Sequence, residues 1–505
     1  MPIPTAARTA ARRWFWLLLG CGVLLRCVAL TQPLVDAHLL RQGQTAAATR
    51  SLLAEPGIVW RIPWVGDFVE HYVLELPLYN YLTMAVHALG PNPVVAGKLV
   101  SIALWAFSFW LLQGIWQRTL DPTSAGWANL IFVVSPLGVF FGQAVTPEML
   151  LQVLAFAFVL LLIRYDEQPC PVRWFLAAAT GLLSLLIKAP GVAHLYLVLV
   201  FLIVARGGWK MLFLPRHVVA GLLSAACLFA WAQYVGSVNR TPLSFGGAEA
   251  HFRGFIGPLA MRFALRPWLM VAIYLGALLI PAFALLVAMR GGWRVVREGC
   301  ARPLAAWLVS LVPFYLLWLG NGPASQSYYN LPTLAPAAAL FGLGMSALLA
   351  DHWVDRWRTA AAALAGAITI GCAVPGIVYL FTPDRALLAA AQWTRTHTEP
   401  DAVVLFRAAH RSDMVEYGVN AAFPFNAERR AFIWTAELPE PYRTAALERS
   451  TYAVVTKPLP TGRAAAWLRQ LRHQPEPVAE STEWLRKIGF APVAEEAGFV
   501  AFRRQ

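Results

Sequence analysis

The sequence has 505 residues, of which 58% are hydrophobic and 13% are charged, and its formal net charge is +14. The charged fraction is about half that of a typical soluble protein, which excludes an ordinary soluble enzyme and favours a polytopic membrane protein. The excess of Lys and Arg does not require nucleic-acid binding, because most of these residues fall in short connectors between apolar runs. The six cysteines all precede residue 373 and show no metal-type spacing.

Apolar runs that approach the roughly 20 residues needed to cross a bilayer recur along the first 381 residues. No small-residue cleavage site follows the first run, so we expect it to remain as a helix. A break at Lys188-Ala189-Pro190-Gly191 is expected to separate two of the spans. The runs predict eleven transmembrane helices, near 14–30, 95–116, 126–142, 147–163, 174–187, 191–205, 216–235, 268–289, 303–319, 330–350 and 360–381.

Basic residues gather in the connectors on the side of the N-terminus, whereas connectors 143–146 and 320–329 contain no Lys or Arg. By the positive-inside rule, the N-terminus is expected to be cytoplasmic and residues 382–505 to lie outside the membrane. Two long segments, 31–94 and 237–267, are then also on the outer side. The first has an aromatic, amphipathic second half that predicts interfacial helices, and the second carries four arginines opposed only by Glu249.

Residues 382–505 predict a small α/β domain. Helical periodicity covers 383–398 and 462–473, and β-rich runs cover 402–406, 431–435 and 452–456. A closing hairpin is expected at 491–503, around Ala497-Gly498. The predicted fold is therefore a polytopic α-helical membrane domain over 1–381, followed by a soluble extracytoplasmic α/β domain over 382–505.

The stretch 35–50 begins where the first span ends and is much more polar than that span. Its pattern predicts a helix from Asp36, with His38, Arg41, Gln42, Thr45 and Thr49 on one face. Two interpretations of Asp36 stay open at this point. Its carboxylate is either the N-cap of that helix, or a group held at the membrane surface to meet a charged lipid head group.

Other polar residues lie near the outer ends of the predicted spans. Ionisable groups there are costly unless they meet water, one another or a ligand, so a shared cavity accounts for them economically. Structural alternatives exist for several: Glu148 suits a helix N-terminus, Arg262 and Arg266 can extend to lipid head groups from one helical face, and tyrosines are common at interfaces. The set comprises Asp36, Arg41, Glu75, Glu148, Lys188, Arg262, Arg266, Gln326, Tyr328 and Tyr329.

The order of these residues resembles the membrane glycosyltransferases of the GT-C class, in particular the bacterial branch related to aminoarabinose transferase and the protein O-mannosyltransferases. Five short motifs carry the resemblance over residues 14–380. They are Asp36 with the Arg41-Gln42-x-x-Thr45 stretch, Glu75-Leu76-Pro77-Leu78-Tyr79, Pro147-Glu148, Lys188-Ala189-Pro190 and Tyr328-Tyr329-Asn330-Leu331-Pro332. The sequence departs from the family at Ala37, where the family has a second acid, and at Glu148, where it often has Asp.

The resemblance implies a transferase of the bacterial cytoplasmic membrane. Its donor would be a polyprenyl-phosphate-linked sugar and its acceptor a lipid, a glycan or a protein. Asp36 is expected to act as the general base of an inverting transfer. The cations expected to bind the donor phosphate are Arg41, Lys188, Arg262 and Arg266. The residues expected to contact sugar, acceptor or lipid are His38, Gln42, Glu75, Tyr79, Glu148, Tyr328 and Tyr329.

No cofactor or metal site is expected, because the acids are scattered, although Asp36 and Glu148 leave a divalent cation open. The alternative function is a transporter or flippase of a lipid-linked sugar or anionic lipid, which would explain polar residues in the membrane zone and a broken helix at Lys188. Against it, no matching broken helices recur in two halves of the sequence.

Overall fold

The computed structural model describes residues 5–54, 75–238, 256–320, 322–350, 357–407, 422–434, 440–457 and 478–505. The chain divides into two compact units, and the segment after the first helix belongs to the same unit as the C-terminal residues. The first unit comprises Met1–Leu30, Lys98–Gln233 and Phe252–Val378, and the second comprises Thr31–Gly97, Tyr234–His251 and Tyr379–Gln505.

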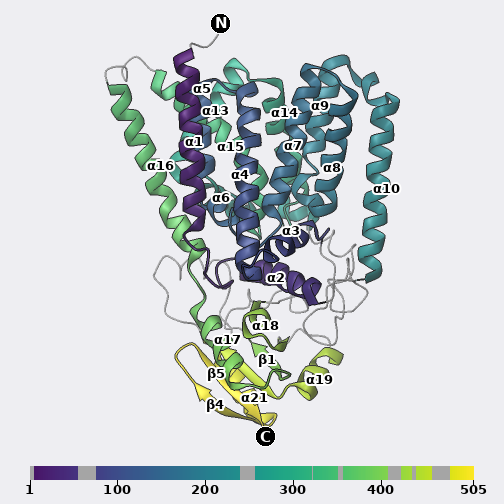
Figure 1. Ribbon diagram of the computed structural model, residues 1–505, viewed down its shortest axis with the longest axis vertical. Helices are drawn as coiled ribbons and strands as arrows, with labels where there is room; N and C mark the ends of the chain where they lie inside the picture. Colours follow the sequence, from purple (N-terminus) through teal and green to yellow (C-terminus); the bar gives the residue numbers. More distant parts are fainter. Residues whose placement is uncertain are drawn as a thin grey trace. The chain divides into compact units, whose positions relative to one another are not determined.

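The first unit is a bundle of helices, most of which run side by side (Figure 1). Each of the eleven predicted spans overlaps at least one helix of this structure. The α-helices are α1 (Thr5–Cys27), α4 (Pro93–Thr119), α5 (Pro122–Val134), α6 (Pro136–Phe141), α7 (Glu148–Glu167), α8 (Pro171–Val192), α9 (Leu195–Gly207), α10 (Pro215–Val238), α12 (Leu265–Ile273), α13 (Ala282–Glu298), α14 (Arg302–Leu317), α15 (Leu334–Ala350) and α16 (Arg358–Phe381). Shorter turns are the 3₁₀ helices η1 (Trp209–Phe213), η2 (Leu259–Arg262) and η4 (Ser327–Thr333), and the π-helix η3 (Tyr274–Leu279). The span predicted over 126–142, however, is divided between α5 and α6 at Ser135, just before Pro136.

Six helices within the described residues are long and apolar enough to cross a membrane, and a bent pair would make a seventh. The expected number of eleven spans therefore stays a prediction. The predicted single helix over 268–289 is wrong, because α12 and η3 meet α13 at a bend of 107°. The break falls at Pro281, which has no N–H to continue the helical hydrogen bonding.

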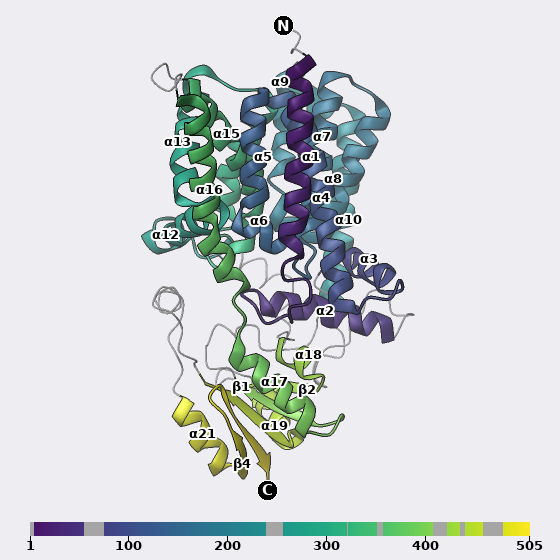
Figure 2. The same cartoon turned by 60° about the vertical axis from the view of Figure 1, so that its left-hand side comes forward.

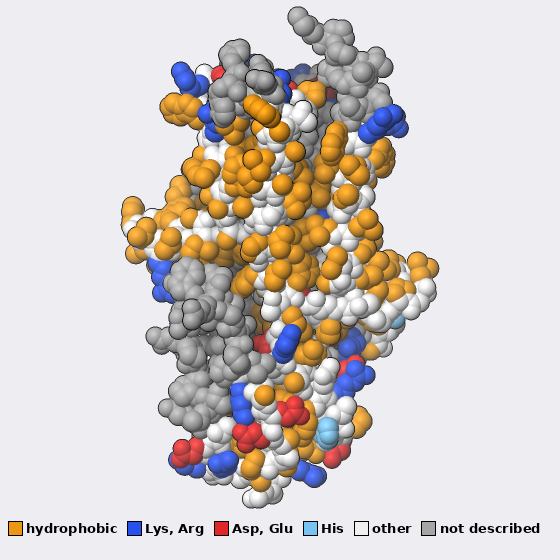
Figure 3. Space-filling model, turned by 90° about the vertical axis from the view of Figure 1, so that its left-hand side faces the viewer, with side chains coloured by type: hydrophobic (Ala, Val, Ile, Leu, Met, Phe, Trp, Pro, Cys, Tyr) orange, Lys and Arg blue, Asp and Glu red, His pale blue; other side chains and the backbone are white. Residues whose placement is uncertain are grey.

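Large hydrophobic side chains are exposed on helices at the periphery of the first unit, such as α10 and α16. Leu222 and Phe229 of α10 are each 67% exposed, and Leu364 of α16 is 62% exposed. Figure 3 shows one face of the molecule on which hydrophobic side chains cover the helical part. Apolar surface of this extent is expected where a helix contacts lipid.

Glycine allows the helices at the centre of the bundle to approach closely. A Cβ atom on Gly291 of α13 would lie 1.9 Å from the carbonyl oxygen of Leu340, and one on Gly344 of α15 would lie 2.0 Å from that of Val287. The two helices therefore pack backbone against backbone, as small residues permit in membrane bundles.

The second unit contains a five-stranded sheet in the order β2-β1-β3-β5-β4. The strands β1 (Val403–Arg407), β2 (Arg430–Ile433) and β3 (Tyr452–Thr456) are parallel, and β4 (Phe490–Glu495) and β5 (Phe499–Arg504) form an antiparallel hairpin. All three predicted strands and the predicted hairpin are confirmed. Position 435 and the predicted helix 462–473 lie outside the described residues.

Helices cover both faces of this sheet (Figure 2). Side chains that alternate along β1 explain this, because Val404 and Phe406 enter one core and Leu405 enters the other. The first core is closed by α17 (Arg385–His397) and α18 (Ala422–Ala427). The second is closed by α19 (Glu440–Arg449) and α21 (Val478–Lys487). The helix predicted over 383–398 is confirmed as α17, with Asp384 as its N-cap.

Two further helices of the second unit come from the segment 31–94, whose expected position outside the membrane stays a prediction. They are α2 (Leu39–Ala54) and α3 (Leu78–His87). Val35 and Leu39 belong to the first core of the sheet, together with Leu387 and Phe406. This segment thus shares a hydrophobic core with residues more than 300 positions later in the chain.

The close helix packing predicts that substitution by alanine affects stability differently at Gly291 and at its neighbour Gly292. Gly291→Ala should destabilise the bundle by about 1–3 kcal/mol, because the methyl group forces backbones apart. Gly292→Ala should be neutral or slightly stabilising, since a Cβ there has no neighbour within 4 Å and Ala favours helix. Thermal denaturation of both purified variants in detergent measures the difference. Equal midpoints for the two variants would contradict the close helix contact.

Candidate active site

Asp36 lies in a buried turn just ahead of α2. Only 6% of the residue is exposed, and its Oδ1 accepts a hydrogen bond of 2.6 Å from Nε2 of Gln42. The helix begins at Leu39, so the prediction of a helix starting at Asp36 is wrong. The physical reason is that residues 36–39 form a tighter turn: the carbonyl oxygen of Asp36 accepts from the N–H of Leu39, three residues later, instead of from residue 40 as an α-helix requires. Gln42, one helical turn into α2, thus orients a carboxylate that the turn presents.

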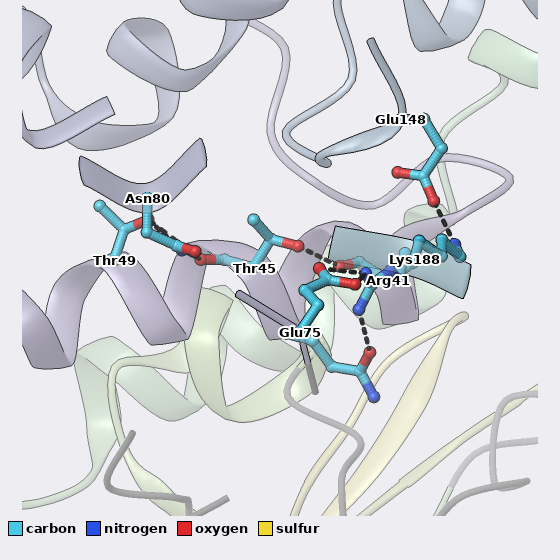
Figure 4. A network of polar contacts seen from close by, with 8 residues as sticks. Arg41, Thr45, Thr49, Glu75, Asn80, Glu148 and Lys188 are labelled. Atoms are coloured by element: carbon cyan, nitrogen blue, oxygen red, sulfur yellow. Dashed lines mark hydrogen bonds and ion pairs between the residues drawn. The ribbon is translucent and has the colours of Figure 1, made fainter. Parts of the chain in front are cut away.

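Arg41 and Glu75 form an ion pair in the second unit. Nη2 of Arg41 donates to both carboxylate oxygens of Glu75, and Nη1 lies 3.5 Å from Oε1 of Gln44. The side chains of the pair are 9% and 14% exposed, so the partners are held where charge is costly unless compensated. The guanidinium predicted to bind phosphate is thus already neutralised by a carboxylate (Figure 4).

Helix α3 fixes the orientation of α2 by polar contacts. Nδ2 of Asn80 donates to the carbonyl oxygen of Thr45 at 3.0 Å and to Oγ1 of Thr49 at 2.9 Å (Figure 4). Tyr79, 1% exposed, donates its hydroxyl proton to the carbonyl oxygen of Gly97. These contacts give Tyr79 a structural role, and its predicted contact with lipid or sugar stays a prediction. His38 is half-buried beside Asp36 in the sequence, and its role also stays a prediction.

A second polar cluster lies in the first unit, around the break in α8. Lys188 has non-helical backbone angles (φ −160°, ψ 82°) two residues before Pro190, as predicted from the sequence. Its Nζ donates to Oε1 of Glu148 at 2.5 Å and lies 4.2 Å and 4.7 Å from the ring centroids of Tyr328 and Tyr329. The sequence therefore identified all four members of this cluster, which combines an ion pair with cation–π contacts.

A small cavity of about 30 Å³ adjoins this cluster. Its lining includes all four cluster residues, together with Gln152, His194 and Trp307. Sequence reasoning missed Gln152, although it follows Glu148 by one helical turn on the same face. It also missed His194, a lone histidine three residues after Gly191. Neither ring nitrogen of His194 has a hydrogen-bond partner among the described residues.

Arg262 and Arg266 do not share a helical face, so that prediction is wrong. Arg262 ends η2, whereas Arg266 lies in α12, and Ala264 between them is extended. A helix running through both would place the ring of Pro267 against the carbonyl of Phe263, four residues earlier.

The guanidinium of Arg262 donates to the carbonyl oxygens of Leu316 and Leu317 at the end of α14, which is a helix-capping contact. Arg266 is exposed, and phosphate binding by either arginine stays a prediction.

Among the residues the structure describes, no three His, Cys, Asp or Glu side chains lie together as ligands for a metal ion. The polar groups instead form two sets that each contain an ion pair. One set, in the second unit, contains the Gln42–Asp36 hydrogen bond and the Arg41–Glu75 pair, and the other lines the cavity in the first unit. A carboxylate oriented by an amide can accept a proton, and paired cations can stabilise an anion after exchanging partners.

No family model and no curated protein matches this sequence, but its fold matches solved structures over nearly its whole length. ArnT from Cupriavidus metallidurans bound to undecaprenyl phosphate has a TM-score of 0.61 at 15% identity, covering 97% of each chain. The same protein in the apo state has a TM-score of 0.65 at 14% identity, covering 98% of each chain. Arabinofuranosyltransferase AftD from mycobacteria has a TM-score of 0.55 at 16% identity, covering 97% of this chain and 41% of AftD. The comparison confirms the predicted relationship in fold to the GT-C membrane glycosyltransferases.

The buried pair predicts non-additive effects on stability. Glu148→Gln leaves an ammonium without its carboxylate and should cost about 3–5 kcal/mol. Adding Lys188→Met to Glu148→Gln should restore part of this loss, because neither charge then remains buried. Thermal midpoints of the two single variants and the double variant in detergent measure the coupling. Arg118→Ala, which breaks a partly exposed pair with Glu167, should shift the midpoint little. Strict additivity of the two buried substitutions would contradict the pairing.

Proposed function

We propose that this chain is an integral-membrane glycosyltransferase that takes a sugar from a polyprenyl-phosphate donor at the outer face of the cytoplasmic membrane. The observation that carries the proposal is the fold match over 97% of the chain to an ArnT structure bound to undecaprenyl phosphate. Within the second unit, the oriented carboxylate of Asp36 and the Arg41–Glu75 pair are groups that such a reaction can use. The acceptor is proposed to be a lipid, a glycan or a protein.

In the proposed reaction, Asp36 accepts the proton of an acceptor hydroxyl. The hydroxyl oxygen then forms a bond to the anomeric carbon while the bond from that carbon to the phosphate oxygen breaks, with inversion of configuration. The electron pair of the broken bond leaves with the polyprenyl phosphate. Arg41, which lies in the same unit as Asp36, is proposed to stabilise the developing charge. Because phosphate is already a good leaving group, no separate general acid is required.

The mechanism also gives the carboxylate partner of Arg41 a role. A lone buried Arg would be costly in the absence of donor, and Glu75 removes that cost. When an anionic donor binds, it can take over part of the contact with the guanidinium. Glu75 is therefore proposed to hold Arg41 in place between turnovers and to contact sugar or acceptor hydroxyls once displaced.

Transport of a lipid-linked sugar or anionic lipid is the second candidate, and the broken helices favour it. Helix α8 is kinked at Lys188 and the α12–α13 pair is bent by 107°, features common in transporter binding sites. The two functions differ in covalent chemistry. Loss of the sugar from a labelled polyprenyl-phosphate sugar supports the transferase, and movement of the intact donor across a proteoliposome membrane supports the transporter.

Asp36→Asn should lower transfer by about 10²–10⁴-fold, the usual contribution of a general base. The variant keeps the size of the side chain and an oxygen that can accept from Gln42, so its fold and donor affinity should be retained. Asp121→Asn is the matched control, because Asp121 only caps α5 and Asn caps equally well. Sugar release from the donor, measured per folded molecule, compares the two. Full activity in Asp36→Asn would remove Asp36 from the mechanism.

If Arg41 binds the donor phosphate, substitutions of Arg41 and of its partner Glu75 should change the affinity for lipid phosphate in opposite directions. Arg41→Ala should weaken binding of undecaprenyl phosphate about 10–100-fold, since a charge-assisted contact contributes about 1.5–3 kcal/mol. Glu75→Gln should strengthen binding, because it removes a competing negative charge. Equilibrium binding of the bare lipid phosphate to detergent-purified protein measures both, with Arg118→Ala as the control for net charge. If Glu75→Gln weakens binding as much as Arg41→Ala, the pair is structural and does not bind phosphate.

A further inference from the structure

The turn that carries Asp36 is buried without belonging to a helix or a strand. Leu34 is 1% exposed and Val35 is fully buried, and residues 32–38 have no regular secondary structure. Backbone N–H and C=O groups buried in this way need partners, because water is excluded from them. The location of those partners determines what fixes the position of the Asp36 carboxylate.

The partners come from the far end of the sequence. Ala37 N–H donates to Leu380 C=O at 3.2 Å, and Asp384 N–H donates to Val35 C=O at 2.5 Å. Two side chains add to this pairing. Nε2 of Gln32 donates to the carbonyl oxygen of Phe381 at 2.9 Å, and Nδ2 of Asn426 donates to that of Leu34 at 3.3 Å. Four hydrogen bonds therefore connect residues 32–37 to residues 380–384 and to Asn426 within the second unit.

Apolar contacts reinforce the same connection. Val35 lies on one side of Asp36 and Leu39 on the other, and both belong to the core that α17 and α18 form on the sheet. Phe406 and Phe423 stack in that core with ring centroids 4.0 Å apart. The residues on both sides of Asp36 are thus fixed by the packing that stabilises the C-terminal fold.

We propose that residues 380–384 and helix α18 form a positioning clamp for the Asp36 turn, in which Gln32 and Asn426 are positioning residues for the transfer reaction. The inference rests on the proposed function, because it takes Asp36 to be the base. A general base must lie within hydrogen-bond reach of the proton it accepts. A displacement of about 1 Å can lower a rate 10²-fold without altering substrate binding. The clamp therefore acts on turnover through the placement of the carboxylate.

Gln32→Leu tests the clamp, because it removes one donor at nearly constant volume, and Asn426→Ala is the second variant. Turnover at saturating donor should fall about 10-fold in each, while the KM for donor stays within about twofold. Arg429→Ala is the matched control. It follows α18 and removes hydrogen bonds to Arg395 and Thr398, so it perturbs the same fold without touching residues 32–37.

Hydrogen exchange measured by mass spectrometry gives a readout that does not depend on activity. The peptide covering residues 32–40 should exchange faster in Gln32→Leu and Asn426→Ala than in the unaltered protein, and Arg429→Ala should leave it unchanged. Unchanged exchange in both clamp variants would overturn the proposal. So would an equal loss of turnover in Arg429→Ala, which would reveal general destabilisation.

A last comparison separates failure of the clamp from failure of the proposed function. In the Asp36→Asn background, Gln32→Leu should lower the residual turnover less than twofold, because the group that it positions is gone. A further 10-fold loss there would overturn the clamp and leave Asp36 as the base. Full turnover of Asp36→Asn alone would instead remove Asp36 from the mechanism and overturn the proposal for that reason. Faster exchange with unchanged turnover would likewise overturn the positioning role.

Discussion

A charge that is removed from water must be compensated, and this constraint accounts for most of the polar architecture described here. Arg41 is held by Glu75 in one unit, and Lys188 is held by Glu148 in the other. In each case the sequence separation is large, at 34 and 40 positions, so each pair also fixes the geometry of its segment. Removing one partner would leave an uncompensated ion, which costs far more than the intact pair contributes.

Compensation takes a different form at Arg26, and the contrast indicates which cations can bind a ligand. Arg26 is fully buried in α1, where its guanidinium donates to the carbonyls of Gly22 and Gly138 at 2.9 Å and lies 3.5 Å from the Trp105 ring. Backbone carbonyls and a fixed ring cannot move aside for an anion. A glutamate side chain can, because it has rotatable bonds and can turn to other partners. The guanidinium of Arg262 also donates to backbone carbonyls, so its partners resemble those of Arg26 more than those of Lys188.

Local signals in the sequence predicted much of the fold. The parallel strand at Val403, the hairpin that ends at Arg504 and the break at Lys188 all follow from side-chain periodicity, turn residues or proline. The bend at Pro281 was missed because a proline within an apolar run is also compatible with one continuous span that is only kinked. The grouping of residues 31–97 with the C-terminal sheet was missed because no local pattern reports which distant segments share a core.

The same distinction between local sequence signals and tertiary packing applies to the candidate site. Residue types and their order singled out Asp36, Arg41 and Lys188 as candidates, since ionisable groups near span ends are costly and therefore informative. Which residue each one contacts was not predictable, because the pairing of Asp36 with Gln42 and of Arg41 with Glu75 depends on tertiary packing. Gln32 and Asn426 carry no charge and lie in no motif, so nothing in the sequence distinguishes them from ordinary surface amides. Their importance follows from the need of an irregular buried turn for hydrogen-bond partners, which becomes visible only when the turn is seen among the residues that enclose it.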